Sequence, residues 1–214
     1  MAPDDRRAAL VLATVPLVRA HGLSVSTKQI AQAAGVAEGT IFGVFPDKNA
    51  LLVAALIKAL DPRPTLDAMT AIDPFLGLRE RLTMTANLIF RRFQDNAELM
   101  AAARKLAFTN GDYPEATAYM AASRESLLSS VAAVIEPDGV RLRRSAEETA
   151  GLLLLFCGAA LYGPYGDPAK FDAAALVSLL LDGLLIDHDG GNTTNENGNP
   201  TNDNEDDDGG THRC

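Results

Sequence analysis

The histidines and cysteines are the side chains of this chain best suited to catalysis or metal binding, and their spacing supports neither. His21 ends a helical segment, whereas His188 and His212 lie in a polar C-terminal stretch. Cys157 and Cys214 form no CxxC pair, and the HExxH, GxSxG, GxGxxG and phosphate-loop motifs are absent. We therefore expect no enzyme, with no catalytic residue, no metal and no cofactor.

A different chemistry, recognition of DNA, is indicated between residues 27 and 48. Two short helical segments there flank a turn at Gly35. Small alanines allow the two helices to cross closely, and the residues that can hold them together are Ile30, Ala31, Ala34, Val36 and Ile41. This pattern is typical of a helix-turn-helix, whose second helix can enter a major groove. The alternative is a helical hairpin with no role in DNA binding.

The same stretch resembles the signature of the TetR family of bacterial transcriptional regulators. That signature reads approximately I-A-x-x-A-G-V-S-x-G-T-L-Y-x-H-F-x-x-K-x-x-L, and residues 30–51 read I-A-Q-A-A-G-V-A-E-G-T-I-F-G-V-F-P-D-K-N-A-L. Helix order and length extend the resemblance over about residues 1–186. In the second half it rests only on the number and size of the helices.

The resemblance implies a set of DNA-binding residues. Those expected at phosphates or in the groove are Thr27, Lys28, Glu38, Gly39, Thr40, Phe42 and Lys48. An exposed acid without a base contact is the alternative for Glu38, and a solvated lysine is the alternative for Lys48. Two departures remove polar groups, because Phe42 replaces the usual Tyr and Val44 the usual His. We therefore expect fewer phosphate contacts and a shallower dependence of DNA affinity on salt.

Helical periodicity runs through almost the whole chain and predicts an all-α fold. The expected parts are a helix-turn-helix DNA-binding domain over 1–60, a linker over 61–72, a larger ligand-binding and dimerisation domain over 73–186 and a disordered acidic tail over 187–214. The linker begins at Asp61-Pro62-Arg63-Pro64, a predicted hinge, and Asp73-Pro74 is predicted to open the next helix.

Charge is unevenly distributed along the chain, whose net charge is −9. Residues 187–214 contain eight acidic residues and one basic residue, whereas residues 1–60 contain six basic and four acidic residues. The first segment therefore permits a nucleic-acid role. The apolar run 150–163 is 14 residues long, and a bilayer span needs about 20. Asp4, Asp5 and Arg19 argue against a signal peptide. We expect a cytoplasmic protein with no membrane partner.

The larger domain is expected to bind a small-molecule effector and to form a homodimer. An apolar effector pocket, for a hydrophobic or aromatic ligand, is predicted from Met84, Leu88, Phe90, Phe93, Met100, Phe108, Tyr113, Tyr119 and Phe156. A dimer interface built as a four-helix bundle is predicted from Leu152, Leu155, Ala159, Leu176, Leu179, Leu180, Gly183 and Leu184. Ordinary core packing is the alternative for both sets.

Taken with the resemblance, these features predict a repressor. The unliganded dimer would bind a near-palindromic operator in double-stranded DNA, and the effector would release it. An activator, or a dimeric adaptor that has lost DNA binding, are the alternatives.

Overall fold

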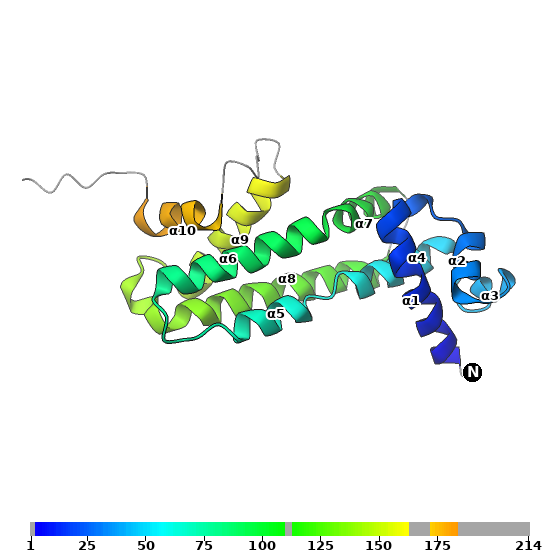
Figure 1. Ribbon diagram of the computed structural model, residues 1–214, viewed down its shortest axis with the longest axis horizontal. Coiled ribbons are helices and arrows are strands. Elements are labelled where there is room, and N and C mark those ends of the chain that lie inside the picture. The colour runs from blue at the N-terminus through cyan, green and yellow to red at the C-terminus, as the bar shows by residue number, and fades with distance from the viewer. Residues whose placement is uncertain (1–2, 110–112, 163–171, 184–214) are drawn as a thin grey trace, which may run out of the picture. The chain divides into compact units, whose positions relative to one another are not determined.

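The computed structural model describes residues 3–109, 113–162 and 172–183, and over these residues it contains helices and no strands (Figure 1). The all-α fold predicted from the sequence is therefore confirmed. The helices, in chain order, are α1 (Pro3–His21), η1 (Gly22–Ser24), α2 (Thr27–Ala34), α3 (Gly39–Phe42), α4 (Lys48–Ala59), α5 (Arg63–Thr70), α6 (Leu78–Asp95), α7 (Ala97–Thr109), α8 (Pro114–Ile135), η2 (Glu136–Arg141), α9 (Ala146–Tyr162) and α10 (Ala173–Asp182).

A first hydrophobic core joins α1, α2, α3 and α4. Its centre is built from fully buried side chains that include Leu10, Ile30, Ile41 and Leu51. Helix α7, which the sequence places in the second domain, adds Leu99, Ala102 and Leu106 to this same core. The helix-turn-helix therefore rests on a helix from the part of the chain predicted to bind a ligand.

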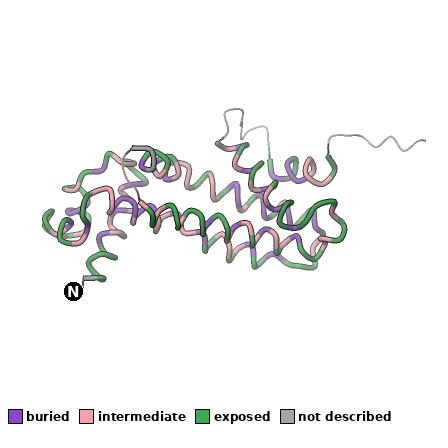
Figure 2. The backbone as a smooth tube through the Cα atoms, turned by 180° about the vertical axis from the view of Figure 1, so that it is seen from behind, coloured by how far each residue is buried: buried purple, intermediate pink, exposed green. Residues whose placement is uncertain are grey.

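A second core joins α5, α6, α8, α9 and α10. The long helices α6 and α8 run side by side, with α5 along α8 (Figure 1). Buried and exposed residues alternate along these helices as expected for one buried face each (Figure 2). Cys157 lies in this core and burial raises the pKa of its thiol to about 12, so it packs as an inert apolar residue.

Two elements around the predicted linker differ from the sequence expectation. Helix α5 occupies residues 63–70, where no helix was expected, and buries Met69 in the second core. Asp61 precedes it and accepts hydrogen bonds from the Arg63 backbone and guanidinium, which hold the pKa of the Asp61 carboxyl at about 2. This short-range cap lets a helix start directly after the predicted hinge.

The predicted start of α6 at Pro74 is also wrong. The Asp73 carboxylate accepts a hydrogen bond from the Phe75 N–H at 2.9 Å, and this turn leaves the Phe75 ring 95% exposed. The helix begins only at Leu78, after Gly77. Asp73 therefore stabilises a turn in place of a helix N-terminus.

A buried arginine closes the end of the bundle where α8 meets η2. The Arg81 side chain is 5% exposed and donates to the carbonyls of Leu76 at 2.6 Å and of Val134 at 3.1 Å. It also forms an ion pair with Asp138 at 2.7 Å. These bonds hold the first turn of α6 against the end of α8.

Candidate nucleic-acid interface and ligand cavity

The start of α2 is fixed by a capping box. The Ser26 N–H donates to the Gln29 side-chain oxygen at 2.8 Å, and the Gln29 N–H donates to the Ser26 hydroxyl at 3.2 Å. At the other end Gly35 has φ 66°, a left-handed conformation that favours glycine. The Val36 N–H then donates a hydrogen bond to the Ala31 carbonyl at 3.0 Å. This turn sets the angle between α2 and the next helix.

The second helix of the motif, α3, is a single turn of four residues. Ile41 and Phe45 anchor it, with relative exposures of 0% and 1%. The Arg7 guanidinium of α1 lies over the Phe45 ring, 4.3 Å from its centre. Phe42 points the other way and is 54% exposed. The side of α3 opposite its anchors is therefore open to a partner.

Thr27 and Glu38, both predicted at the DNA, are hydrogen-bonded to each other. The Thr27 hydroxyl donates to the Glu38 carboxylate. This bond joins the first residue of α2 to the residue that precedes α3. Glu38 thus holds the two helices of the motif together, which is a role within the chain that the sequence did not indicate.

Lys48 is the first residue of α4 and is half-buried. Its ammonium donates to the Leu23 carbonyl at 3.1 Å. Next to it, the Asp47 carboxylate accepts from the Ala50 N–H at 2.7 Å and caps the helix. An ammonium has three donors, so one bond to Leu23 fixes Lys48 beside the motif and leaves it able to bind a phosphate.

Gly39, the first residue of α3, is exposed and its backbone needs no glycine. Its φ is not positive, and a Cβ built there would meet no atom of the chain within 4 Å. The other predicted residues of the motif are also accessible, since Lys28 is exposed and Thr40 is half-buried. If Gly39 is required, the requirement must come from a molecule outside the chain.

Two of the cavities among the described residues are lined by residues of α4, or by Leu60 at its end, together with residues of α7 and α8. The smaller one is about 130 Å³ and lies between α4, α7 and α8; its walls include Val53, Leu56, Leu106, Tyr113 and Tyr119. The Tyr119 hydroxyl is buried and has no hydrogen-bond partner within the described part of the chain. Desolvation by burial raises the pKa of this phenol.

The larger cavity is about 580 Å³, in the range of roughly 300–1,000 Å³ typical of small-molecule sites. Its walls come from α6, α7, α8 and α9, and its lining residues include Phe93, Met100, Met120, Leu127 and Leu154. Leu60 and Met120 line both cavities. The two spaces therefore adjoin at these side chains.

Arg92 ties the larger cavity to the end of α4. It lines the cavity from α6 and donates to the Leu60 carbonyl at 2.7 Å and to the Asp61 carbonyl at 3.0 Å. Leu60 caps the C-terminus of α4, where a helix leaves its last carbonyls without a partner of their own, and Asp61 is the next residue. Sequence reasoning missed Arg92 because nothing in its surroundings on α6 signals the distant carbonyls.

Comparison with known proteins agrees with this geometry. Residues 10–55 match the model of the bacterial regulatory proteins of the tetR family. A TetR-family transcriptional regulator from Mesorhizobium loti has a similar structure, with 19% identity over 85% of this chain and 98% of that chain and a TM-score of 0.62. The resemblance to the TetR family is confirmed. No curated protein sequence matches the chain.

Two further solved structures have a similar fold. The fatty acid degradation regulator FadR from Bacillus halodurans has 19% identity over 84% of this chain and 96% of that chain, with a TM-score of 0.57. FadR from Bacillus subtilis, solved in complex with stearoyl-CoA, has 16% identity over 83% of this chain and 99% of that chain, also with a TM-score of 0.57. At these identities the likeness concerns the fold.

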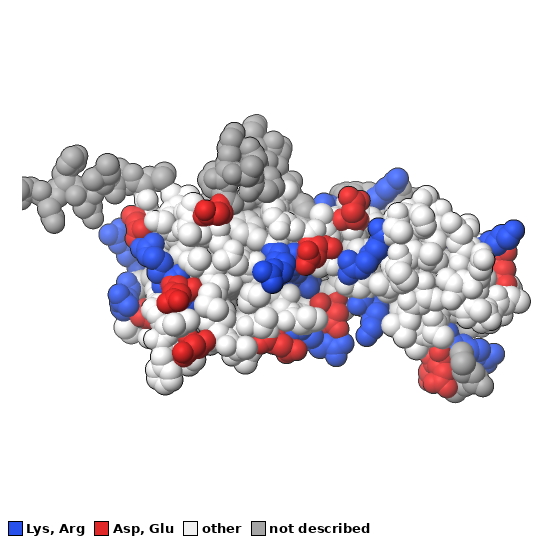
Figure 3. Space-filling model, in the orientation of Figure 1, with Lys and Arg blue, Asp and Glu red and all other residues white. Residues whose placement is uncertain are grey.

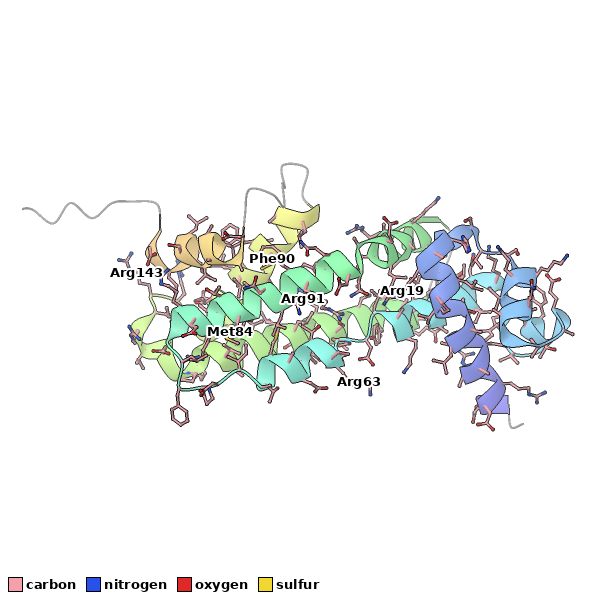
Figure 4. The ribbon with its side chains drawn as sticks, viewed as in Figure 1. Arg19, Arg63, Met84, Phe90, Arg91 and Arg143 are labelled. Carbon is pink, nitrogen blue, oxygen red and sulfur yellow. The ribbon has the colours of Figure 1, made fainter. Side chains whose placement is uncertain are left out.

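The pocket residues predicted from the sequence divide into three groups. Phe93 and Met100 line the larger cavity, and Tyr113 and Tyr119 the smaller one. The others line neither cavity: Met84 is 41% exposed, Phe156 is 37% exposed, Leu88 packs against the second core and Phe90 is buried in it (Figure 4). The side chain of Phe108 lies outside the described residues. Periodicity marks apolar faces, but it does not separate core from cavity wall.

The predicted dimer residues also divide. Leu152, Leu155 and Ala159 are exposed on α9, where they form one stripe with Phe156 at spacings of three and four residues. Leu176 is buried in the chain's own core, while Leu179 and Leu180 are half-buried and Gly183 is exposed. Leu184 lies outside the described residues. Leu155 and Ala159 also line the larger cavity, so the stripe and the cavity meet.

The surface charge of the helix-turn-helix end is modest. On the face shown in Figure 3, most of the surface near α1 and α4 is uncharged and the Lys and Arg groups lie at its margins. Within the described residues, no cluster of three or more potential metal ligands occurs, and no helix has the length and apolar character needed to cross a bilayer.

Proposed function

We propose that this chain is an effector-controlled, DNA-binding transcriptional repressor of the TetR type, active as a homodimer. The observation that carries this proposal is the pair of hydrogen bonds from Arg92 to the carbonyls of Leu60 and Asp61. They connect the wall of a ligand-sized cavity to the helix that follows the recognition helix.

The proposed signal runs along α4. This helix has 12 residues, about 18 Å at 1.5 Å per residue. At its other end Lys48 donates to the Leu23 carbonyl of η1, just before the motif, and α4 also packs on α1. A ligand that moves Arg92 or Leu60 would displace α4 and with it α3. The two α3 helices of a dimer would then no longer match the spacing of two half-sites.

The effector is proposed to be a mainly apolar small molecule, because most residues of the larger cavity are apolar. The solved complex of Bacillus subtilis FadR with stearoyl-CoA supports the view that this fold can hold a ligand with a long apolar part. The exposed stripe on α9 is the proposed contact with the second copy, because a second copy packed there would bury its leucines.

The test is selection of genomic DNA fragments by the purified full-length protein, followed by sequencing. Enrichment of an inverted repeat is the expected result, and its neighbouring genes would suggest the effector. No enrichment by a folded, dimeric protein would contradict DNA binding. It would favour an adaptor of the same fold, in line with the loss of polar groups at Phe42 and Val44. Reporter expression with and without the protein then separates repression from activation.

A further inference from the structure

The charges around the larger cavity all have one sign. Two arginines, Arg92 and Arg124, belong to its wall, and no Asp or Glu does. The rest of the wall is mainly leucine, methionine and phenylalanine. A mainly apolar space with only positive charges at its wall favours a ligand that is apolar along its length and negative at one point.

The two arginines are not equivalent. Arg92 is half-buried and its guanidinium already donates to two backbone carbonyls. Arg124 is exposed on α8, and within the described residues no hydrogen bond or ion pair holds its guanidinium. The planar guanidinium can bind a carboxylate through two parallel hydrogen bonds. Arg124 is therefore the group placed to receive a ligand's charge.

The residue next to Arg124 supplies a second polar group. Ser123 is 8% exposed and lines the same cavity. Its hydroxyl forms no hydrogen bond within the part of the chain that the structure describes. A hydroxyl in a cavity wall can donate a hydrogen bond to a ligand oxygen. Ser123 and Arg124 therefore give the wall of the larger cavity an O–H donor and a guanidinium donor.

We infer that the effector is an amphipathic carboxylate whose anionic end is held by Arg124 and Ser123 and whose apolar part fills the larger cavity. This inference rests on the proposed function, because it takes the larger cavity as the effector site. It narrows the effector from any hydrophobic or aromatic molecule to one with a single negative end.

The test compares three probes with the same 12-carbon chain: dodecanoate, dodecanol and dodecyltrimethylammonium. Each is titrated calorimetrically into the full-length protein. Dodecanoate is expected to bind at least tenfold tighter than either of the others, since a hydrogen-bonded charge pair contributes about tenfold or more in affinity. Equal affinity for the anion and the cation would overturn the inference.

Variants locate the charge contact. Arg124→Gln is expected to weaken dodecanoate binding about tenfold and to leave dodecanol binding unchanged. Arg124→Lys keeps the charge and should retain most of the preference, so a folding defect in the first variant does not remove the test. Arg91→Gln is the matched control, because Arg91 is an exposed arginine on α6 that lines neither cavity (Figure 4).

The outcomes separate the inference from the proposed function. If Arg124→Gln binds dodecanoate as the unchanged protein does, the inference is overturned. If none of the three probes binds, it is overturned as well. Neither result changes the outcome of the DNA-fragment selection. That experiment tests the proposed regulator independently and has its own negative outcome.

Discussion

The Arg92 guanidinium on α6 lies 2.7 Å from the carbonyl oxygen of Leu60, the residue that ends α4. We expect Arg92→Met to loosen this end of α4, because two carbonyls lose their donor. Hydrogen exchange of the peptide covering residues 56–61 should become faster, and stability should fall by about 1–3 kcal/mol. Arg91→Met is the control. Unchanged exchange in the Arg92 variant would contradict the coupling.

Gly39→Ala separates a structural role from a binding role at the start of α3. The added Cβ meets no atom of the chain within 4 Å, so the melting temperature should stay the same or rise slightly. A methyl group at a closely approached DNA surface should reduce affinity at least tenfold. Fluorescence anisotropy with the selected DNA fragment measures this change.

Gly77→Ala is the matched control for Gly39, because it too has open space around its Cβ but precedes α6. Normal DNA binding by both variants would show that Gly39 does not lie at the DNA.

Phe42→Tyr restores a hydroxyl on the open side of α3. The ring is 54% exposed, so the new group costs little in the folded protein and can donate to a phosphate. One additional hydrogen bond corresponds to about 1 kcal/mol, or roughly fivefold tighter DNA binding. The control is Phe75→Tyr, since the Phe75 ring is 95% exposed and lies outside the motif. Equal affinities for the two variants would place Phe42 away from the phosphates.

Some of this architecture could be predicted from local sequence signals. The motif around Gly35 could be predicted, because its left-handed turn and its apolar positions Ile30 and Ile41 are encoded within a few residues. Helix α5 was missed because Asp61-Pro62-Arg63-Pro64 also reads as a break. Its stability depends on the Asp61 bond to Arg63 and on Met69 packing in a distant core.

The position of the larger cavity was harder to predict, because it too depends on packing between distant helices. Phe93 lines it, whereas Phe90, three residues earlier on the same helix, is buried in the core. A helical period identifies both as apolar but does not say which neighbours leave a space between them. Arg124 carries no signal in the sequence, because an exposed arginine on a helix is the ordinary case.

Leu152→Glu tests the exposed stripe on α9. Leu152 is 39% exposed and, unlike Leu155, does not line the larger cavity. A carboxylate buried in a dimer interface is costly, so we expect light scattering to show a dimer for the unchanged chain and a monomer for the variant at the same concentration. Val140→Glu is the control, at a position that is 99% exposed and outside the stripe. If the Leu152 variant is still dimeric, the dimer interface does not lie at this stripe.

Asp138 should make the free energy of unfolding depend on pH in the acidic range. The Arg81 guanidinium, and next the Arg141 guanidinium, lower the pKa of Asp138 below its ordinary value of 3.8. A carboxyl whose pKa is lower in the folded than in the unfolded state stabilises the fold above the unfolded pKa. This contribution is lost as the pH falls through the lower, folded pKa.

Urea unfolding of the unchanged chain and of Asp138→Asn measures this contribution. The chain should be more stable than the variant by a constant margin near neutral pH, and the margin should shrink below about pH 4. Glu125→Gln, at an exposed acid on α8, is the control and should change stability little. A margin that stays constant down to pH 2 would show that the Arg81–Asp138 ion pair does not stabilise the fold.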